Sequence, residues 1–231
     1  MENKKNILSK VSDPDLPPIK EDFRETFQWR IFRIMAEFVD GFQFVSSFDK
    51  SVTIFGSSSF DENNPDYQKA RKMGELLSKE GYWVVTGGGP GIMEGANRGA
   101  YEPEGKSVGI NIQIETQERA NDYLTKSISF HYFFARKVML SFASSGYLFF
   151  PGGFGTLDEF FEMITLIQTK KIDGGIVVVA IGREFWQPLF DWIENDLCHK
   201  YKTIKEENLK IFQLVDTPEE ALEIIKNNNI C

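Results

Sequence analysis

Short apolar runs alternate with glycine-rich turns and helical patterns through most of this 231-residue chain. Beyond Asp49, each apolar run is followed by small residues and then by apolar positions at helical spacing. This alternation is typical of parallel strands joined by helices, because a parallel connection must cross over the sheet. We predict strands at residues 52–55, 83–85, 108–112, 147–150, 176–181 and 211–215. The sequence therefore predicts an α/β fold: a doubly wound parallel sheet with helices on both faces.

The N-terminal part of the chain has a different pattern. Residues 1–20 are polar and rich in proline, so we expect a flexible leader there. Through residues 21–48, apolar side chains recur every three or four positions, which predicts an amphipathic N-terminal helix. We interpret its aromatic stripe as core or subunit packing, with a ligand-facing surface as the alternative. Residues 49–231 are then expected to form the Rossmann-like α/β domain.

The last predicted helix has a well-defined start. Thr217 is suited to the N-cap, Pro218 to the first helical position, and Glu220 stands three residues after the cap. Together they form a capping box, in which the hydroxyl and the carboxylate satisfy free backbone amides.

Charge and composition exclude several classes of protein. Acidic residues outnumber basic ones by 34 to 26, and a net charge of −8 gives little attraction for a nucleic acid backbone. The chain has only Cys198 and Cys231, and only His131 and His199, which leaves no usual set of zinc ligands and no disulfide framework. No signal sequence or membrane-spanning run is apparent. We expect a cytoplasmic protein that binds neither nucleic acid nor membrane.

Two glycine-rich loops repeat the same pattern. Residues 88–94 read Gly-Gly-Pro-Gly-Ile-Met-Glu, and residues 152–158 read Gly-Gly-Phe-Gly-Thr-Leu-Asp. Each loop follows an apolar run and precedes a helical pattern. Such turns direct the free amides and the positive dipole of a helix N-terminus toward an anion. The alternative is that the glycines only supply positive φ angles in tight turns. The repeat favours two phosphate-type turns facing one crevice.

Two common nucleotide motifs do not fit these loops. The dinucleotide fingerprint needs a third glycine where Glu94 stands. Residues 105–107 resemble the end of a P-loop, but an apolar strand follows them where that motif requires a helix. We therefore exclude both motifs.

Three segments together resemble a known family. Residues 86–94, 133–137 and 151–159 read Thr-Gly-Gly-Gly-Pro-Gly-Ile-Met-Glu, Phe-Phe-Ala-Arg-Lys and Pro-Gly-Gly-Phe-Gly-Thr-Leu-Asp-Glu. In this order they resemble the LOG ("LONELY GUY") phosphoribohydrolases, over about residues 25–226. The sequence of the first segment and the expected long N-terminal helix resemble those of the longer bacterial branch of this family. Some relatives carry the label lysine decarboxylase, yet no lysine here stands in a recognisable setting for a pyridoxal phosphate Schiff base.

The resemblance implies a reaction and its catalytic residues. It implies hydrolysis of a nucleoside 5′-monophosphate, AMP or a cytokinin riboside 5′-monophosphate, to free base and ribose 5-phosphate, without metal or organic cofactor. It also implies a homodimer or larger homo-oligomer with sites near the subunit interface. Glu159 and Arg136 are the catalytic residues by this resemblance. Breaking the glycosidic bond gives an oxocarbenium-like sugar, which a carboxylate can stabilise while it positions water.

Spacing alone leaves another reading of Glu159 open. Thr156 and Glu159 stand three residues apart, so they also fit the ends of a capping box. For the chain as a whole, the alternative to an enzyme is a protein that binds or senses a phosphorylated nucleotide without cleaving it.

The expected substrate-binding residues come from the loops and the segments beside them. We expect the 5′-phosphate at the second loop, with the first loop closing the other side, and the sugar or base at two serines after the first strand; Arg98 is a further candidate anion contact. The binding residues are Ser57, Ser58, Gly88, Gly89, Gly91, Met93, Lys137, Gly152, Gly153, Gly155 and Thr156.

Overall fold

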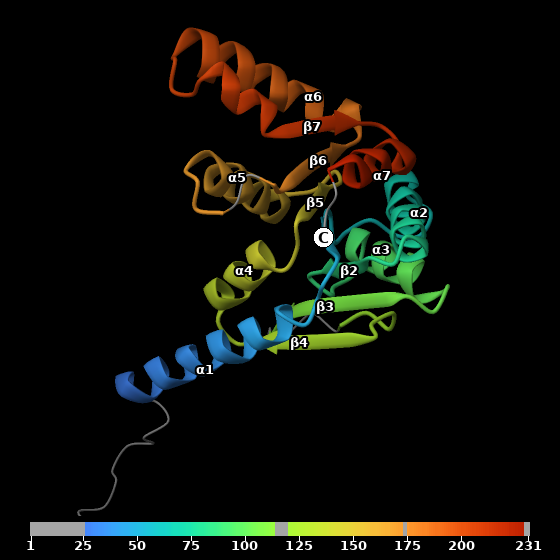
Figure 1. The fold of residues 1–231 in the computed structure, drawn as a ribbon, viewed down its shortest axis with the longest axis vertical. Coiled ribbons are helices and arrows are strands. Elements are labelled where there is room, and N and C mark those ends of the chain that lie inside the picture. The colour runs from blue at the N-terminus through green and yellow to red at the C-terminus, as the bar shows by residue number, and fades with distance from the viewer. Residues whose placement is uncertain (1–25, 114–119, 173–174, 229–231) are drawn as a thin grey trace, which may run out of the picture. The chain divides into compact units, whose positions relative to one another are not determined.

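A computed structural model describes residues 26–113, 120–172 and 175–228 of the chain (Figure 1). The chain divides into two compact units, residues 1–36 and 37–231. Helix α1, Phe27–Val45, occupies the described part of the first unit and continues into the second. The predicted leader, residues 1–20, lies outside the described residues.

A seven-stranded parallel sheet forms the centre of the second unit, in the order β4-β3-β2-β1-β5-β6-β7. The predicted doubly wound α/β fold is confirmed. The strands are β1 Ser51–Phe55, β2 Trp83–Thr86, β3 Lys106–Ile112, β4 Lys126–Phe130, β5 Gly146–Phe149, β6 Val177–Ile181 and β7 Phe212–Val215.

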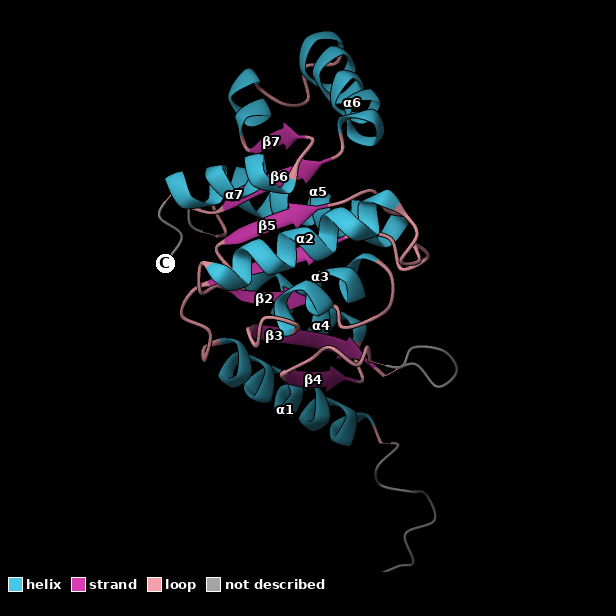
Figure 2. Cartoon of the chain, turned by 90° about the vertical axis from the view of Figure 1, so that its right-hand side faces the viewer, coloured by secondary structure: helices cyan, strands magenta, loops and turns pink. Residues whose placement is uncertain are grey.

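Helices cover both faces of this sheet (Figure 2). One face carries α2, Pro65–Lys79, α3, Ile92–Tyr101, and α7, Pro218–Asn227. The other carries α4, Phe133–Phe142, α5, Phe154–Gln168, and α6, Arg183–Trp192, which continues into a π-helical segment, Ile193–Lys200. A short 3₁₀ helix, Glu206–Lys210, precedes β7.

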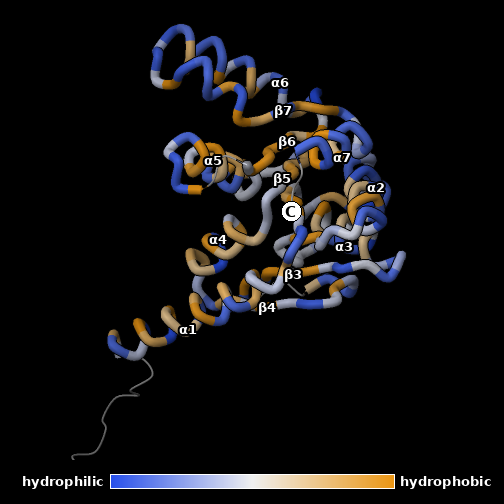
Figure 3. The backbone as a smooth tube through the Cα atoms, in the orientation of Figure 1, coloured by the Kyte–Doolittle hydropathy of each residue, from blue (hydrophilic) through white to orange (hydrophobic). Residues whose placement is uncertain are grey.

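The central strands are apolar on both sides because helices bury both faces. In β6, Val177, Val179 and Ile181 pack into the core beneath α2 and α7, whereas Val178 and Ala180 pack into the core beneath α5 and α6. The tube in Figure 3 is accordingly hydrophobic along β6. A continuous apolar run is what a strand buried on both faces requires, and this is why the sequence reveals these strands.

The edge strand β4, Lys126–Phe130, was not predicted. Its sequence is Lys-Ser-Ile-Ser-Phe, and only Phe130 is buried. An edge strand with one covered face does not carry the continuous apolar run that marks the central strands.

The capping box of the last helix is confirmed. Thr217 accepts a hydrogen bond from the amide of Glu220, and the Glu220 carboxylate accepts from the amide of Thr217 at 3.1 Å. Within the described ranges, no helix is both long and apolar enough to cross a membrane.

Candidate active site

A cavity lies at the carboxyl edge of the sheet, at the point where the strand order reverses. β1 lies between β2 and β5, and the chain builds outward from β1 to β4 before it returns to β5. Open α/β sheets form their ligand crevice at such a point. The cavity measures about 360 Å³. Its lining residues are Phe55, Gly56, Ser57, Ser58, Ser59, Gly87, Met93, Phe133, Arg136, Leu140, Gly153, Phe154, Gly155, Thr156, Asp158 and Glu159.

Most of the residues expected at the site meet around this cavity. Those that line it are Ser57, Ser58, Met93, Arg136, Gly153, Gly155, Thr156 and Glu159. The others expected there, Gly88, Gly89, Gly91, Lys137 and Gly152, are not among the residues that line the cavity.

Ser57 connects the three loops through its backbone. Its amide donates to the carbonyl oxygen of Pro151 at 3.0 Å, and its carbonyl oxygen accepts from the amide of Ile92 at 2.9 Å. Gly91 has a φ of 73°, and a Cβ atom there would lie 2.3 Å from the Ser57 carbonyl oxygen. Only glycine allows this close approach. The loop after β1 thereby fixes the positions of both glycine-rich loops.

The second glycine-rich loop opens helix α5 onto the cavity. Gly153 is the N-cap, and the first internal bond of the helix runs from the amide of Leu157 to the carbonyl oxygen of Gly153 at 3.1 Å. The amides of residues 154–156 precede that bond, so the helix itself gives them no acceptor. Gly152 packs against Thr156, since a Cβ atom there would lie 2.1 Å from Thr156 Oγ1. The site thus contains a helix N-terminus suited to an anion.

The capping alternative for Glu159 is wrong. Since Gly153 is the N-cap of α5, Thr156 is the third helical residue and Glu159 lies in the second turn. A capping box needs the acid at the third position after the cap. Glu159 therefore has no part in capping this helix.

The first glycine-rich loop is held mainly by bonds within the protein. The Gly88 amide donates to Thr86 Oγ1 at 2.9 Å, and the Gly89 carbonyl oxygen accepts from Asn121 Nδ2 at 3.0 Å. Gly88 has a φ of 73° and lies against Asn111. Only Gly87 and Met93 from this region reach the cavity. The two similar loops therefore differ in role.

A buried polar network beneath that loop was not predicted. Asn97, fully buried on α3, accepts from Thr86 Oγ1 at 2.6 Å and donates to Ser107 Oγ at 2.8 Å. Asn121 Nδ2 also donates to Asn97 Oδ1 at 3.0 Å. An asparagine on the buried face of a helix is the one sequence signal that marks such a network.

Arg136 belongs to α4, which covers the face of the sheet opposite to α3, and its side chain lines the cavity. Its Nε donates to the carbonyl oxygen of Ile110 at 2.8 Å, and its Nη2 donates to that of Gly87 at 3.3 Å. The guanidinium is thereby fixed at the ends of β3 and β2, beside the cavity. A rigid, permanently charged group in this place suits an anionic or electron-rich ligand.

Glu159 is the buried acid of the cavity wall. It is 8% exposed, and its Oε2 accepts no hydrogen bond from the part of the chain that the structure describes. Burial, and after it the charge of Glu162, raise the pKa of Glu159 to about 8, although the charges of Lys137 and Arg136 act in the opposite direction. An acid perturbed in this way, in a cleft, is a candidate reactive group.

Lys137 forms ion pairs with acidic residues of α5. Its Nζ lies 2.5 Å from Asp158 Oδ2 and 3.5 Å from Glu162 Oε2. Burial acts to lower the pKa of Lys137, but the three carboxyl groups of Asp158, Glu162 and Glu159 outweigh burial and raise it. Lys137 is therefore held as a cation, and it is not among the residues that line the cavity.

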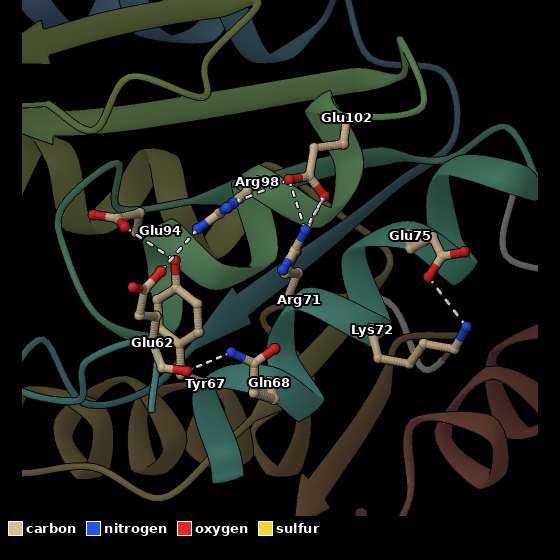
Figure 4. A network of polar contacts seen from close by, with 9 residues as sticks. All are labelled: Glu62, Tyr67, Gln68, Arg71, Lys72, Glu75, Glu94, Arg98 and Glu102. Atoms are coloured by element: carbon tan, nitrogen blue, oxygen red, sulfur yellow. Dashed lines mark hydrogen bonds and ion pairs between the residues drawn. The ribbon is translucent and has the colours of Figure 1, made fainter. Parts of the chain in front are cut away.

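Arg98, the further candidate anion contact, belongs to a separate polar network (Figure 4). Its Nε donates to Glu102 at 3.0 Å, and its Nη1 lies 3.3 Å from Glu62. Figure 4 shows its guanidinium between Tyr67 and Glu102, in the space between α2 and α3. Arg98 does not line the cavity.

The sequence also missed the apolar wall of the cavity. Phe55, Phe133, Leu140 and Phe154 contribute to it. Phe154 is 92% exposed although it is a large aromatic residue. An aromatic residue in the variable position of a glycine-rich turn was the available signal.

The fold and the site define a class: a parallel α/β protein whose strand-tip cavity combines a helix N-terminus with a fixed arginine and a buried acid. The sequence profile of the family described as "Possible lysine decarboxylase" matches residues 93–225. The chain belongs to this family, and its resemblance to the LOG proteins is confirmed.

One curated relative agrees with this placement, and two solved structures have a similar fold. The cytokinin riboside 5′-monophosphate phosphoribohydrolase of Rhodococcoides fascians is 28% identical over 149 residues, which cover 63% of this chain and 75% of that protein. The molybdenum cofactor binding protein of Rippkaea orientalis has a similar fold, with a TM-score of 0.58 at 23% identity over 77% of this chain and 94% of its own. The molybdenum cofactor carrier protein of Chlamydomonas reinhardtii has a TM-score of 0.56 at 18% identity, over 78% and 98% of the two chains.

Proposed function

We propose that this chain hydrolyses the N-glycosidic bond of a nucleoside 5′-monophosphate, AMP or a cytokinin riboside 5′-monophosphate, to free base and ribose 5-phosphate. The observation that carries the proposal is the buried carboxyl group of Glu159 in the wall of a cavity that also receives the N-terminus of α5. The relative from Rhodococcoides fascians, named for this type of reaction, supports it.

In this proposal the 5′-phosphate binds at the N-terminus of α5. The amides of residues 154–156 have no acceptor in the helix, and the helix dipole favours a negative charge there. Thr156 adds a hydroxyl group from the same turn. Arg136 adds a fixed positive charge across the cavity. A local site of this kind binds an anion although the net charge of the chain is −8.

The base and the sugar occupy the remainder of the cavity. Phe133 and Phe154 offer aromatic surfaces to a planar base. Ser57 and Ser58, which line the cavity, contact the sugar in this proposal. Glu159 is then next to the anomeric carbon, where cleavage develops positive charge.

Two other functions are distinguishable from this one. A Schiff-base decarboxylase needs a lysine at the reacting centre. No lysine lies among the described residues that line the cavity, and the pKa of Lys137 is raised, which disfavours a neutral amine. A carrier or sensor of a phosphorylated ligand has no use for a buried acid beside the sugar.

The test is incubation of the purified protein with AMP, GMP, CMP and UMP, followed by chromatography of free base and ribose 5-phosphate. We expect release of base from AMP and none from the Glu159→Gln variant. Binding of AMP without release of base favours the carrier. Equal hydrolysis of adenosine and AMP contradicts the phosphate site.

We also propose that the chain forms a homo-oligomer. Val39 and Phe42 of α1 and Phe142 of α4 are exposed, and the rings of Phe42 and Phe142 meet edge to face at 5.9 Å. Exposed apolar residues grouped in this way are typical of a protein contact surface. Light scattering coupled to size-exclusion chromatography should give at least twice the chain mass of 26.5 kDa.

A further inference from the structure

Two carboxyl groups of α5 share one buried environment. Glu159 and Glu162 stand three residues apart, so they lie on the same side of the helix. In each, the Oε2 atom is buried and accepts no hydrogen bond within the described residues. Water does not reach these oxygens, so ionisation of both groups is costly.

The charged and titratable groups that face this pair come from three elements. From α4, Arg136 lines the cavity and Lys137 forms an ion pair with Glu162, and the charges of both act on Glu159. From β5, Tyr147 is fully buried, and its hydroxyl donates to the carbonyl oxygen of Ser141 at 2.6 Å. From α5 itself, Asp158 is paired with Lys137.

Lys137 is placed asymmetrically with respect to the two carboxyl groups. Its Nζ forms an ion pair with Glu162 Oε2 at 3.5 Å, whereas among the described residues it forms no ion pair with Glu159. Arg136 directs two of its N–H groups to the backbone carbonyls of Ile110 and Gly87. Lys137 therefore compensates a negative charge on Glu162 more directly than one on Glu159.

We propose that Glu159 and Glu162 share a single proton, that Lys137 holds the negative charge on Glu162, and that the proton resides on Glu159 for delivery to the departing base. This inference rests on the proposed hydrolysis. It assigns the protonation state of Glu159 at the start of that reaction, which is the neutral carboxylic acid. Glu162 and Lys137 are positioning residues, since neither lines the cavity.

With the proton on Glu159, the hydrolysis balances in atoms and charge. As the bond between the anomeric carbon and the base nitrogen breaks, its electron pair goes to the base and the Glu159 proton neutralises the base. The carboxylate that remains stabilises the sugar cation. Water then adds to the anomeric carbon and returns one proton to Glu159. One water is consumed, and the carboxyl group regains its starting form.

The inference predicts opposite shifts in two variants. In the natural protein, kcat/KM for AMP should decrease above pH 8, by about tenfold per pH unit, as Glu159 loses its proton. Glu162→Gln removes the neighbouring negative charge, so this decrease should begin at least about one pH unit lower. Lys137→Met removes the compensating cation, so the decrease in kcat/KM should begin at a higher pH than in the natural protein. Lys137→Arg keeps the cation and should restore the natural profile.

A titration that needs no turnover separates this inference from the proposed function. Protein labelled with ¹³C at the glutamate δ-carbons is titrated by NMR, with Glu159→Gln and Glu162→Gln to assign the two signals and the exposed Glu207→Gln as control. We expect the Glu159 signal to titrate near pH 8 in the natural protein and lower in Glu162→Gln. A Glu159 that titrates near its ordinary value, or kcat/KM that increases through pH 8, overturns the inference. The expected titration without hydrolysis of AMP overturns only the proposed function.

Discussion

The carboxyl groups of Glu159 and Glu162 lie within one turn of α5, and each has a buried oxygen without a hydrogen bond among the described residues. A buried acid held in this way links the chemistry of the site to the stability of the fold. The protein keeps an ionisable side chain at a place where its ionisation is unfavourable, which is common at reactive sites.

Glu159→Gln should change the pH dependence of stability. Burial raises the pKa of Glu159 from 4.5 to about 8 in the folded protein. Its contribution to stability is therefore fully present below pH 4.5 and is lost as pH rises toward 8, because the unfolded chain ionises first. Relative to the variant, the natural protein should lose stability over this range, by at most about 1.4 kcal/mol per pH unit.

Urea unfolding of both proteins between pH 5 and 9 measures this effect. The exposed Glu207→Gln serves as the control and should leave the profile unchanged. Parallel profiles for the natural protein and Glu159→Gln would show that Glu159 has an ordinary pKa.

Gly155→Ala should separate binding from folding. A Cβ atom at Gly155 meets no atom within 4 Å, so the variant should be as stable as the natural protein or up to about 1 kcal/mol more stable. A methyl group beside the proposed phosphate position should raise the Kd for AMP about tenfold and leave that for adenosine unchanged. Calorimetric titration measures both constants, with Gly175→Ala, also in open space, as the control. An unchanged Kd for AMP would place the phosphate elsewhere.

Gly88→Ala should destabilise the first glycine-rich loop. Gly88 has a φ of 73°, and a Cβ atom would lie 1.7 Å from Asn111 Oδ1. Gly81 has a φ of 82° with no neighbour within 4 Å, so Gly81→Ala measures the backbone strain alone. We expect a loss of about 1 kcal/mol for Gly81→Ala and at least about 2 kcal/mol for Gly88→Ala, by urea unfolding. Equal losses in the free energy of unfolding for the two variants would mean that the loop moves away from Asn111 without a loss of stability.

Asn97→Ala should reduce the stability of the fold. It leaves Thr86, Ser107 and Asn121 with unsatisfied polar groups in a buried region. We expect a loss of about 2–4 kcal/mol in the free energy of unfolding, because each orphaned buried group costs about 1–3 kcal/mol. A loss below about 0.5 kcal/mol would show that other groups or water replace these bonds.

The sequence revealed the central strands but not the edge. Residues such as Val177–Ile181 must be apolar on both faces, and that run is visible in the sequence. Strand β4 buries only Phe130, so its pattern is indistinguishable from that of a loop.

The site was only partly visible in the sequence. The repeat of the glycine-rich loops revealed that two strand tips meet, and the family resemblance indicated Glu159 and Arg136. The spacing of Thr156 and Glu159 suggested a cap because the start of α5 at Phe154 is not marked by a capping side chain. The pairing of Lys137 with Glu162 joins two helices, and no local pattern records such a contact.

The most direct test of the central claim is a crystal structure of Glu159→Gln with AMP bound. The account predicts the phosphate within hydrogen-bond distance of the amides of residues 154–156 and the anomeric carbon beside the side chain of residue 159. A phosphate bound away from α5, or a sugar turned away from residue 159, would contradict it.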